Sequence, residues 1–221
     1  MNEKIQKFWD KNAGRYDVSE RKSEAVNKDI IAKTINYLNP TDHVLDFGCA
    51  TGTKAIALAG HVRHIHGLDI STEMINLAIK KKDALNIPNI SFSQGTIFSK
   101  ELEPASFDKI VTYAVIHLLE DKEEAARRIH ELLKPGGLFI SVTACFKDKM
   151  AFKNKLEFLS FLMMKKIGLV PLHLNMFSTT DVENLLTNQH FNILVAEKIF
   201  DGISISFVVA RKENNELLKS P

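Results

Sequence analysis

A regular alternation of strand-like and helix-like segments between residues 44 and 143 restricts the fold of this 221-residue chain more than any other feature. Short apolar runs bounded by turn residues alternate with amphipathic stretches, a pattern typical of βαβ units. Because crossovers between parallel strands are right-handed, the connecting helices should cover both faces of one mostly parallel sheet. The predicted strands are Val44–Phe47, His64–Ile70, Ile90–Gln94, Asp108–Val115 and Leu138–Thr143.

The flanking segments follow other patterns. Apolar residues at helical spacing predict helices over residues 2–13, about 20–38, 150–168 and 178–188. Two final strands, 191–199 and 203–210, are separated by Asp201-Gly202, a dipeptide typical of tight hairpins. We therefore predict an α/β fold: a doubly wound, mostly parallel seven-stranded sheet with a C-terminal antiparallel hairpin and helices on both faces.

Composition excludes several classes of protein. Hydrophobic residues make up 45% and charged residues 25%, which rules out disorder over most of the chain. A net charge of +2 is too balanced to favour nucleic acid as a partner. Two cysteines cannot form a disulfide scaffold. The most apolar stretch, residues 158–174, is broken by lysines, glycine and proline, so we expect no stable membrane insertion and a cytoplasmic protein.

Glycines and acidic residues follow the first two predicted strands. The first strand ends in Asp46-Phe-Gly48-Cys-Ala50-Thr-Gly52, immediately before a helix. Glycines there let a ligand approach the backbone, and the helix N-terminus offers free N–H groups. The second strand ends in Asp69, which is placed to accept hydrogen bonds from ribose hydroxyls. The ordered set predicts a cofactor that contains a nucleoside.

The glycine turn departs from the two common phosphate-binding patterns. The chain has no P-loop, and Ala50 replaces the middle glycine of the dinucleotide fingerprint, whose third glycine is missing. Asp46 would also repel a pyrophosphate. An acid beside the turn favours a cationic ligand instead.

These features resemble class I S-adenosylmethionine-dependent methyltransferases of the small-molecule type. The resemblance implies a Rossmann-like fold, S-adenosylmethionine as the cofactor, and transfer of its methyl group to a nucleophile. The matching segments are Phe8-Trp9-Asp10 with Ala13-Gly-Arg-Tyr16-Asp17, the glycine turn from Val44 to Gly52, Gly67-Leu-Asp69-Ile-Ser, Ser106-Phe-Asp108-Lys-Ile-Val, Val115-Ile-His117 and Leu132-Leu-Lys134-Pro-Gly136-Gly137.

The resemblance also implies which residues bind the cofactor. Tyr16 and Trp9 would cover it, and Asp69 would hold the ribose. Where the family usually has Gly-Asp, this chain has Gly95-Thr96, so a threonine hydroxyl or neighbouring backbone must hold the adenine. The full set of expected cofactor-binding residues is Tyr16, Asp46, Gly48, Cys49, Ala50, Gly52, Asp69, Ile70, Thr96, Ile97 and Thr112.

His117, at the end of the fourth strand, is the candidate catalytic residue. A general base is needed only if the acceptor enters protonated. The alternative is a loop histidine satisfied by backbone. His61, His64 and His66 lie close in sequence, but no carboxylate pair accompanies them, and we expect no metal site.

The chain is expected to form a single domain over residues 1–221. Its parts would be an N-terminal helical lid at 1–40, a cofactor-binding core at 41–145, an acceptor cap at 146–190 and a hairpin at 191–211. A stripe of Phe152, Leu156, Leu159 and Met163 would pack the cap helix on the sheet. Further apolar residues, among them Phe158 and Phe161, would then need a second partner: an apolar ligand, a second subunit through 150–177, or a membrane surface.

We therefore expect a small, apolar or aromatic acceptor. Nucleic-acid amino methyltransferases carry a (D/N)-P-P-(Y/F) element where this chain has Thr112-Tyr-Ala-Val. A non-catalytic S-adenosylmethionine-binding regulatory protein is the main alternative, because fold does not fix function. A dinucleotide-dependent oxidoreductase is a weaker one.

Overall fold

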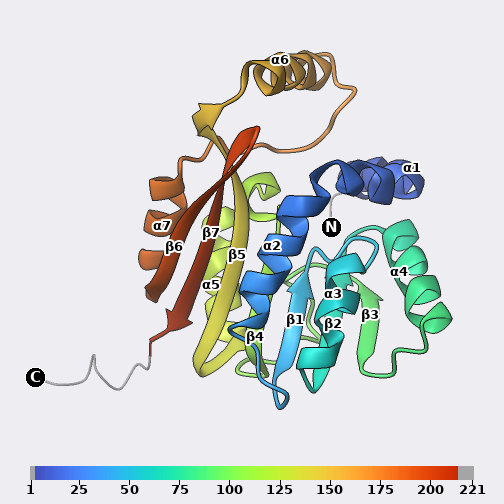
Figure 1. Ribbon diagram of the computed structural model, residues 1–221, viewed down its shortest axis with the longest axis vertical. Helices are drawn as coiled ribbons and strands as arrows, with labels where there is room; N and C mark the ends of the chain where they lie inside the picture. Colours follow the sequence, from blue (N-terminus) through green and yellow to red (C-terminus); the bar gives the residue numbers. More distant parts are fainter. Residues whose placement is uncertain (1–2, 214–221) are drawn as a thin grey trace, which may run out of the picture.

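The computed structural model describes residues 3–213, which form one seven-stranded sheet in the order β3-β2-β1-β4-β5-β7-β6 (Figure 1). Strands β1 to β5 are parallel, and β7 pairs antiparallel with both β5 and β6. The predicted sheet and its C-terminal hairpin are confirmed. The strands are β1 (His43–Phe47), β2 (His64–Asp69), β3 (Ile90–Gln94), β4 (Phe107–Tyr113), β5 (Leu133–Met150), β6 (Phe191–Asp201) and β7 (Ile203–Lys212).

Helices cover both faces of this sheet (Figure 1). Helices α5 and α7 contribute to the core on one face, and α2 and α3 to the core on the other. Single turns of 3₁₀ helix lie at Arg21–Ser23, Ala59–His61 and Ile116–Leu118. The α-helices are α1 (Glu3–Glu20), α2 (Glu24–Ile35), α3 (Thr53–Leu58), α4 (Thr72–Ala84), α5 (Lys122–Leu132), α6 (Phe152–Lys166) and α7 (Thr179–Thr187).

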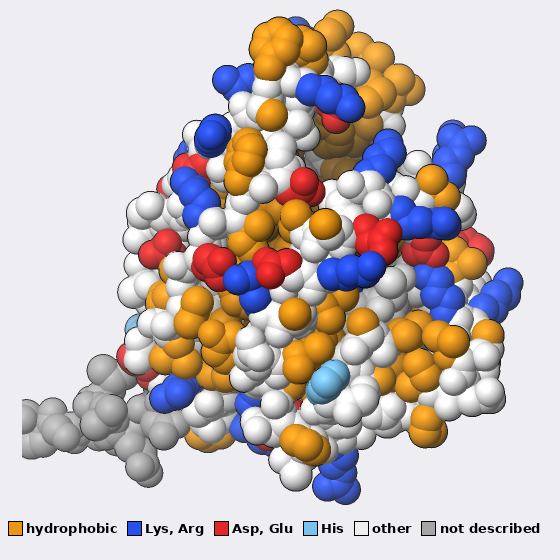
Figure 2. Space-filling view, in the orientation of Figure 1, with side chains coloured by type: hydrophobic (Ala, Val, Ile, Leu, Met, Phe, Trp, Pro, Cys, Tyr) orange, Lys and Arg blue, Asp and Glu red, His pale blue; other side chains and the backbone are white. Residues whose placement is uncertain are grey.

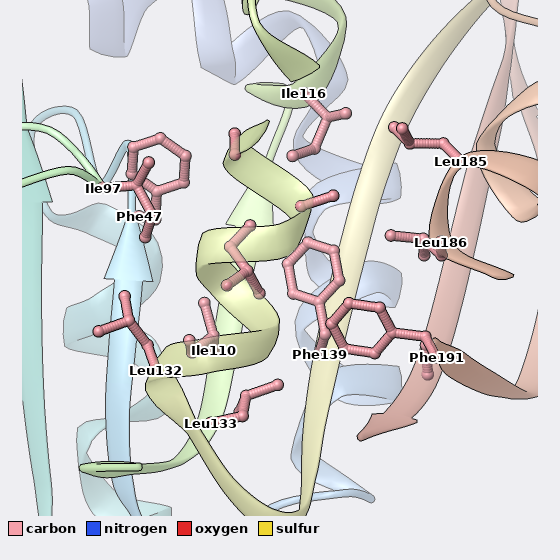
Figure 3. Packing of buried hydrophobic residues seen from close by; sticks show 14 of the residues in the cluster. Phe47, Ile97, Ile110, Ile116, Leu132, Leu133, Phe139, Leu185, Leu186 and Phe191 are labelled. Atoms are coloured by element: carbon pink, nitrogen blue, oxygen red, sulfur yellow. The ribbon is translucent and has the colours of Figure 1, made fainter. Parts of the chain in front are cut away.

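The two cores follow from the alternation of side chains along the strands. Adjacent residues on one strand point to opposite faces, so Ile110 and Phe139 enter the α5–α7 side while Val111 and Ile140 enter the other. Figure 3 shows the first core, where the rings of Phe139 and Phe191 lie 5.8 Å apart. Because both faces are covered, the central strands carry buried apolar side chains on both sides of the sheet.

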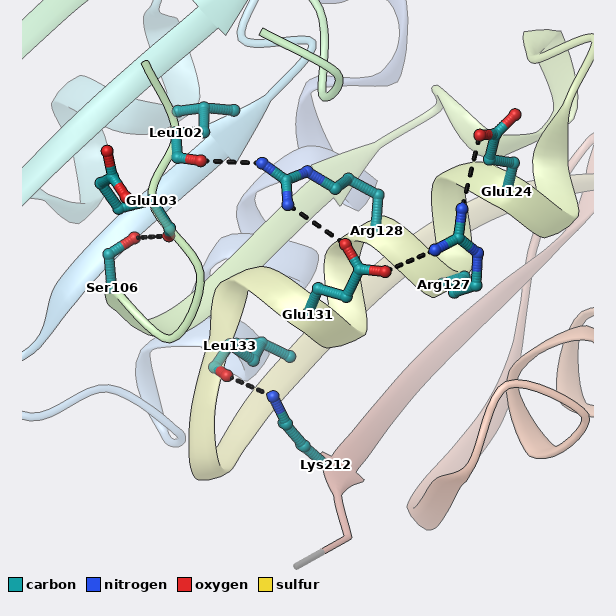
Figure 4. Close-up of polar contacts among 9 residues, drawn as sticks. All are labelled: Leu102, Glu103, Ser106, Glu124, Arg127, Arg128, Glu131, Leu133 and Lys212. Carbon is teal, nitrogen blue, oxygen red and sulfur yellow. Dashed lines mark hydrogen bonds and ion pairs between the residues drawn. The ribbon is translucent and has the colours of Figure 1, made fainter. Parts of the chain in front are cut away.

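Polar contacts hold α5 against neighbouring segments (Figure 4). Arg128 donates to the carbonyl of Leu102 at 2.7 Å and to Glu131 at 3.1 Å. Lys212 of β7 donates to the carbonyl of Leu133 at 2.8 Å, just past the end of α5. These contacts connect α5 to the loop before β4 and to the last strand.

Several element boundaries differ from the prediction, and two of them differ by seven residues. Helix α1 continues through Gly14 to Glu20 rather than ending near residue 13, because Trp9, Ala13 and Tyr16 form one face that packs near Ala50 and Met74. Strand β5 runs on to Met150 rather than ending at Thr143, since β7 is long enough to pair with the added residues.

Helix α6 was predicted with the wrong face toward the protein. It stands apart from the sheet at one end of the molecule and has no buried residue (Figures 1 and 2). The stripe expected to pack on the sheet is exposed, with Phe152 78% and Met163 71% accessible. The opposite face turns inward instead: Phe158 stacks on Phe146 at 4.7 Å between ring centroids, and Phe161 stacks on Phe158 at 6.4 Å.

Candidate active site

The turn after β1 brings the backbone close to β2. The N–H groups of Gly48 and Cys49 both donate to the carbonyl of Leu68, at 2.7 and 3.1 Å. Gly48 has a φ of +76°, and a Cβ there would lie 2.3 Å from Val115 Cγ2. Gly52 has a φ of +74°, and a Cβ there would lie 2.6 Å from Phe92 Cζ. Both positions therefore require glycine, and Ala50, at a φ of 47°, tolerates the same left-handed region at a cost.

Asp69 ends β2 and faces this turn. Its carboxylate accepts from the backbone N–H of Ala50 at 3.0 Å and from that of Ser71 at 2.9 Å. Burial raises the pKa of Asp69, and these backbone donors oppose the rise. The carboxylate thus fixes the turn while its remaining lone pairs stay free for a ligand.

Asp46 is the last but one residue of β1 and is a buried carboxyl group, 1% exposed. Within residues 3–213, neither of its oxygens has a hydrogen-bond partner. Burial raises the pKa of Asp46 to about 7, against the opposing charge of Lys54. Since an unpaired buried carboxylate is costly, a cationic or hydrogen-bonding group placed there would relieve the cost. This geometry fits S-adenosylmethionine, which carries a sulfonium and an ammonium group.

Acidic residues of α1 attach that helix to the site. Asp17 accepts from the Thr51 hydroxyl at 2.5 Å and pairs with Lys81 at 2.6 Å. Asp10 accepts from the hydroxyl of Ser71 at 2.6 Å.

Glu20 makes a third attachment, pairing with Lys54 at 2.6 Å. The sequence analysis assigned no role to these three acids. The three acids are separated by seven and three residues, which places them on one face of a helix. A predicted helix that extended past residue 13 would have shown this pattern in the sequence.

A cavity of about 270 Å³ opens at the carboxyl ends of β1, β2 and β4. Ligands of α/β proteins bind at this edge of the sheet. Trp9 and Tyr16 of α1 form part of the lining, with ring centroids 6.4 Å apart. Seven of the predicted cofactor-binding residues line this cavity: Tyr16, Gly48, Ala50, Asp69, Ile70, Thr96 and Ile97.

Other predicted residues lie elsewhere. Asp46 and Cys49 line a small polar space beside Glu20 and Lys54. Gly52 and Thr112 line neither space: Gly52 is the N-cap of α3, and Thr112 is fully buried in β4.

The Thr96 hydroxyl accepts from the N–H of Phe98 at 3.3 Å, within a local turn. The same hydroxyl would have to form the expected hydrogen bond with adenine. The contact with Phe98 already uses part of its hydrogen-bonding capacity. Thr96 nevertheless lines the cavity.

His117 is buried beside the cavity and does not belong to its lining. Its ring packs edge-to-face on Phe146 at 5.6 Å. Burial lowers the pKa of His117 to about 4, so the imidazole is neutral at pH 7. Nδ1 has no partner among the described residues, and the His117 carbonyl accepts from the Asn175 N–H at 2.7 Å.

The cavity is also lined by residues that the sequence did not predict for the site. They follow β4 or come from distant segments, so only the turn after the fourth strand offered a signal. These residues are Ile5, Phe98, Val115, Leu118, Leu119, Glu120, Asp121 and Leu172. Helix α6 itself contributes none of the lining residues.

Residues 3–213 offer neither a cluster of metal ligands nor a helix that could span a membrane. No group of three histidine, cysteine, aspartate or glutamate side chains there is arranged to hold a metal ion. No helix in that range combines the length and the apolar character needed to cross a membrane.

Comparison with solved structures places this fold among known proteins. The chain superimposes on the YcgJ protein of Bacillus subtilis with a TM-score of 0.68 at 18% identity, covering 85% of this chain and 99% of that one. A phosphoethanolamine N-methyltransferase of Haemonchus contortus, solved with S-adenosylhomocysteine, gives a TM-score of 0.69 at 17% identity, covering 86% of this chain and 53% of that one.

Sequence comparison identifies the family. An uncharacterized methyltransferase of Oceanobacillus iheyensis is 33% identical over 121 residues, 54% of this chain and 54% of that protein. This chain spans about half the length of the first curated relatives it matches. The model of the methyltransferase domain matches residues 38–192. The chain therefore belongs to the methyltransferase domain family, within the class I methyltransferases that use S-adenosylmethionine.

Proposed function

We propose that this chain transfers a methyl group from S-adenosylmethionine to a small, apolar or aromatic acceptor. The observation that carries the proposal is the cavity at the carboxyl edge of the sheet. Its lining combines a carboxylate and a glycine turn, Asp69 and Gly48, with apolar side chains that include Leu118 and Leu172. One cavity thus offers both polar groups for a nucleoside and apolar side chains for an acceptor.

The chain's own residues would divide the work as follows. Asp69 would accept from the ribose hydroxyls, and Asp46 would face the positively charged end of the cofactor. Thr96 and Ile97 would contact the adenine, while Trp9 and Tyr16 would exclude water. S-adenosylmethionine, when bound, supplies a methyl group already activated by a sulfonium, so the protein mainly aligns the reactants.

We propose the same four parts of the chain as before: a lid at 1–40, a cofactor-binding core at 41–145, an acceptor cap at 146–190 and a hairpin at 191–211. Within the cap, Leu172 supports a role in acceptor binding because it lines the cavity. His117 stays a proposed general base. Its neutral imidazole has a free Nδ1, but the role requires the ring to turn from Phe146 toward the cavity.

Methyl transfer is tested with S-adenosylmethionine labelled in the methyl group and a panel of phenols, prenyl compounds and polar amines. We expect labelled product from the apolar members. Labelled polar amines alone would contradict the proposed acceptor class. Tight cofactor binding with no labelled product from any acceptor would favour the non-catalytic alternative.

A further inference from the structure

The outward face of α6 is an apolar stripe that no other element within residues 3–213 covers. Phe152, Leu156, Leu159 and Met163 recur at helical spacing and are all more than half exposed. Ile167 and Leu169 extend the stripe past the end of the helix, at 69% and 66% exposed. Figure 2 shows hydrophobic side chains gathered on the prominence where Figure 1 places α6, with basic side chains around them and a hollow beneath. A patch of this kind on an otherwise well-packed protein marks an interaction surface.

The inward face of the same helix is already occupied. Phe158 and Phe161 continue the stack that begins at His117 and Phe146. The stripe therefore does not become buried by a simple rotation of α6, because rotation would expose the stacked rings instead. Whatever covers the stripe must come from outside the described chain.

The charged side chains beside the stripe indicate what kind of partner would bind it. Helix α6 carries four lysines and one acid, Glu157. By helical spacing, Lys155 and Lys166 lie along one edge of the stripe and Lys153 along the other. Lysines flanking an apolar stripe allow the stripe to enter a lipid surface while the ammonium groups stay with the headgroups.

A second copy of this chain fits the same surface less well. In a two-fold dimer a patch meets itself, so the flanking lysines of both copies would be brought together.

The length of α6 also suits a membrane surface. At 15 residues, α6 is too short to span a bilayer but long enough to lie along its surface.

We propose that Phe152–Leu169 binds the surface of an anionic membrane, with the stripe in the interface and the lysines on the headgroups. This binding goes beyond methyl transfer and does not depend on it. It would hold the opening beneath α6 close to the lipid.

Vesicle flotation tests the proposal with the full chain. One set of vesicles is pure phosphatidylcholine and the other contains equal parts phosphatidylcholine and phosphatidylglycerol. We expect binding to the mixed vesicles that weakens with added salt, and much less to the neutral ones. Equal binding to both sets would overturn the charge argument.

Variants separate insertion from simple charge attraction. The double change Leu156→Ser and Leu159→Ser should abolish flotation, whereas Leu85→Ser, at a similarly exposed leucine just past the end of α4, should not. Changing Lys153, Lys155 and Lys166 to Gln should weaken binding about fivefold per lysine. Unchanged flotation of the leucine double variant would overturn the proposal.

Light scattering separates the lipid surface from self-association. We expect one monomer mass across a range of protein concentrations. A concentration-dependent dimer that the leucine double variant dissociates, together with no flotation, would instead assign the stripe to a subunit interface through 150–177.

Discussion

At the scale of single residues, Asp69 both fixes the glycine turn and faces the cavity. Asp69→Ala removes the acceptor for two backbone N–H groups and the proposed ribose contact. We expect cofactor affinity to fall by roughly 1.5–3 kcal/mol, measured by calorimetry. Asp69→Asn is the matched variant, since it keeps one oxygen acceptor and removes the charge. Unchanged affinity in the alanine variant would refute the assignment.

Asp46 links cofactor binding to stability. Folding raises the pKa of Asp46 from its ordinary value of 3.8 to about 7, so the folded state binds a proton that the unfolded state releases between these pH values. Stability from this group is therefore lost as pH rises from about 4 to about 7.

Asp46→Asn should thus stabilise the cofactor-free protein at pH 8 by roughly 2–4 kcal/mol and change little at pH 4. Cofactor affinity at pH 8 should fall in the same variant. Thermal unfolding across this pH range checks the first effect and calorimetry the second. A stability difference that does not vary with pH would contradict the account.

His117 presents two roles that one pair of variants distinguishes. His117→Phe preserves an aromatic ring against Phe146 and removes Nδ1, whereas His117→Ala removes both. If the imidazole is the base, both variants should lose turnover while keeping cofactor affinity, and wild-type turnover should fall only as pH approaches about 4. Normal turnover by the phenylalanine variant would make the residue structural.

At the scale of elements, α1 should act as a lid whose acids hold it on the site. Hydrogen exchange over residues 5–20 should slow when cofactor binds, because Trp9 and Tyr16 line the cavity. Asp17→Asn should speed that exchange, because it disrupts the contacts with Thr51 and Lys81. Together these contacts should stabilise the docked helix by roughly 1 kcal/mol. Glu3→Gln is the control, since its partner Lys7 lies on the same helix. Equal exchange with and without cofactor would argue against a lid.

At the scale of the whole molecule, stability should come from the covered sheet and not from α6. Phe139→Ala, at a fully buried position, should cost roughly 3–5 kcal/mol of unfolding free energy. The same change at Phe152, 78% exposed, should stay within about 0.5 kcal/mol. Denaturant unfolding measures both. A large cost at Phe152 would mean that α6 is part of the folded core.

Local patterns in the sequence predicted the sheet and several of the residues that line the cavity. Strand periodicity, the glycines of the turn, and the acids at the ends of β1 and β2 are local patterns, and parallel strands necessarily bring their carboxyl ends to one edge. Trp9 and Tyr16 likewise came from a short motif that packs against this edge.

Only the tertiary structure decided which way certain side chains face. The two apolar faces of α6 look alike in sequence, and the stack on Phe146 selected Phe158 over Phe152. His117 was predicted at the end of the fourth strand, but β4 ends at Tyr113 and His117 lies in the 3₁₀ turn Ile116–Leu118. Its ring packs on Phe146 and stays outside the cavity lining. Such choices depend on partners distant in sequence, because burial is a property of the assembled core and not of any one segment.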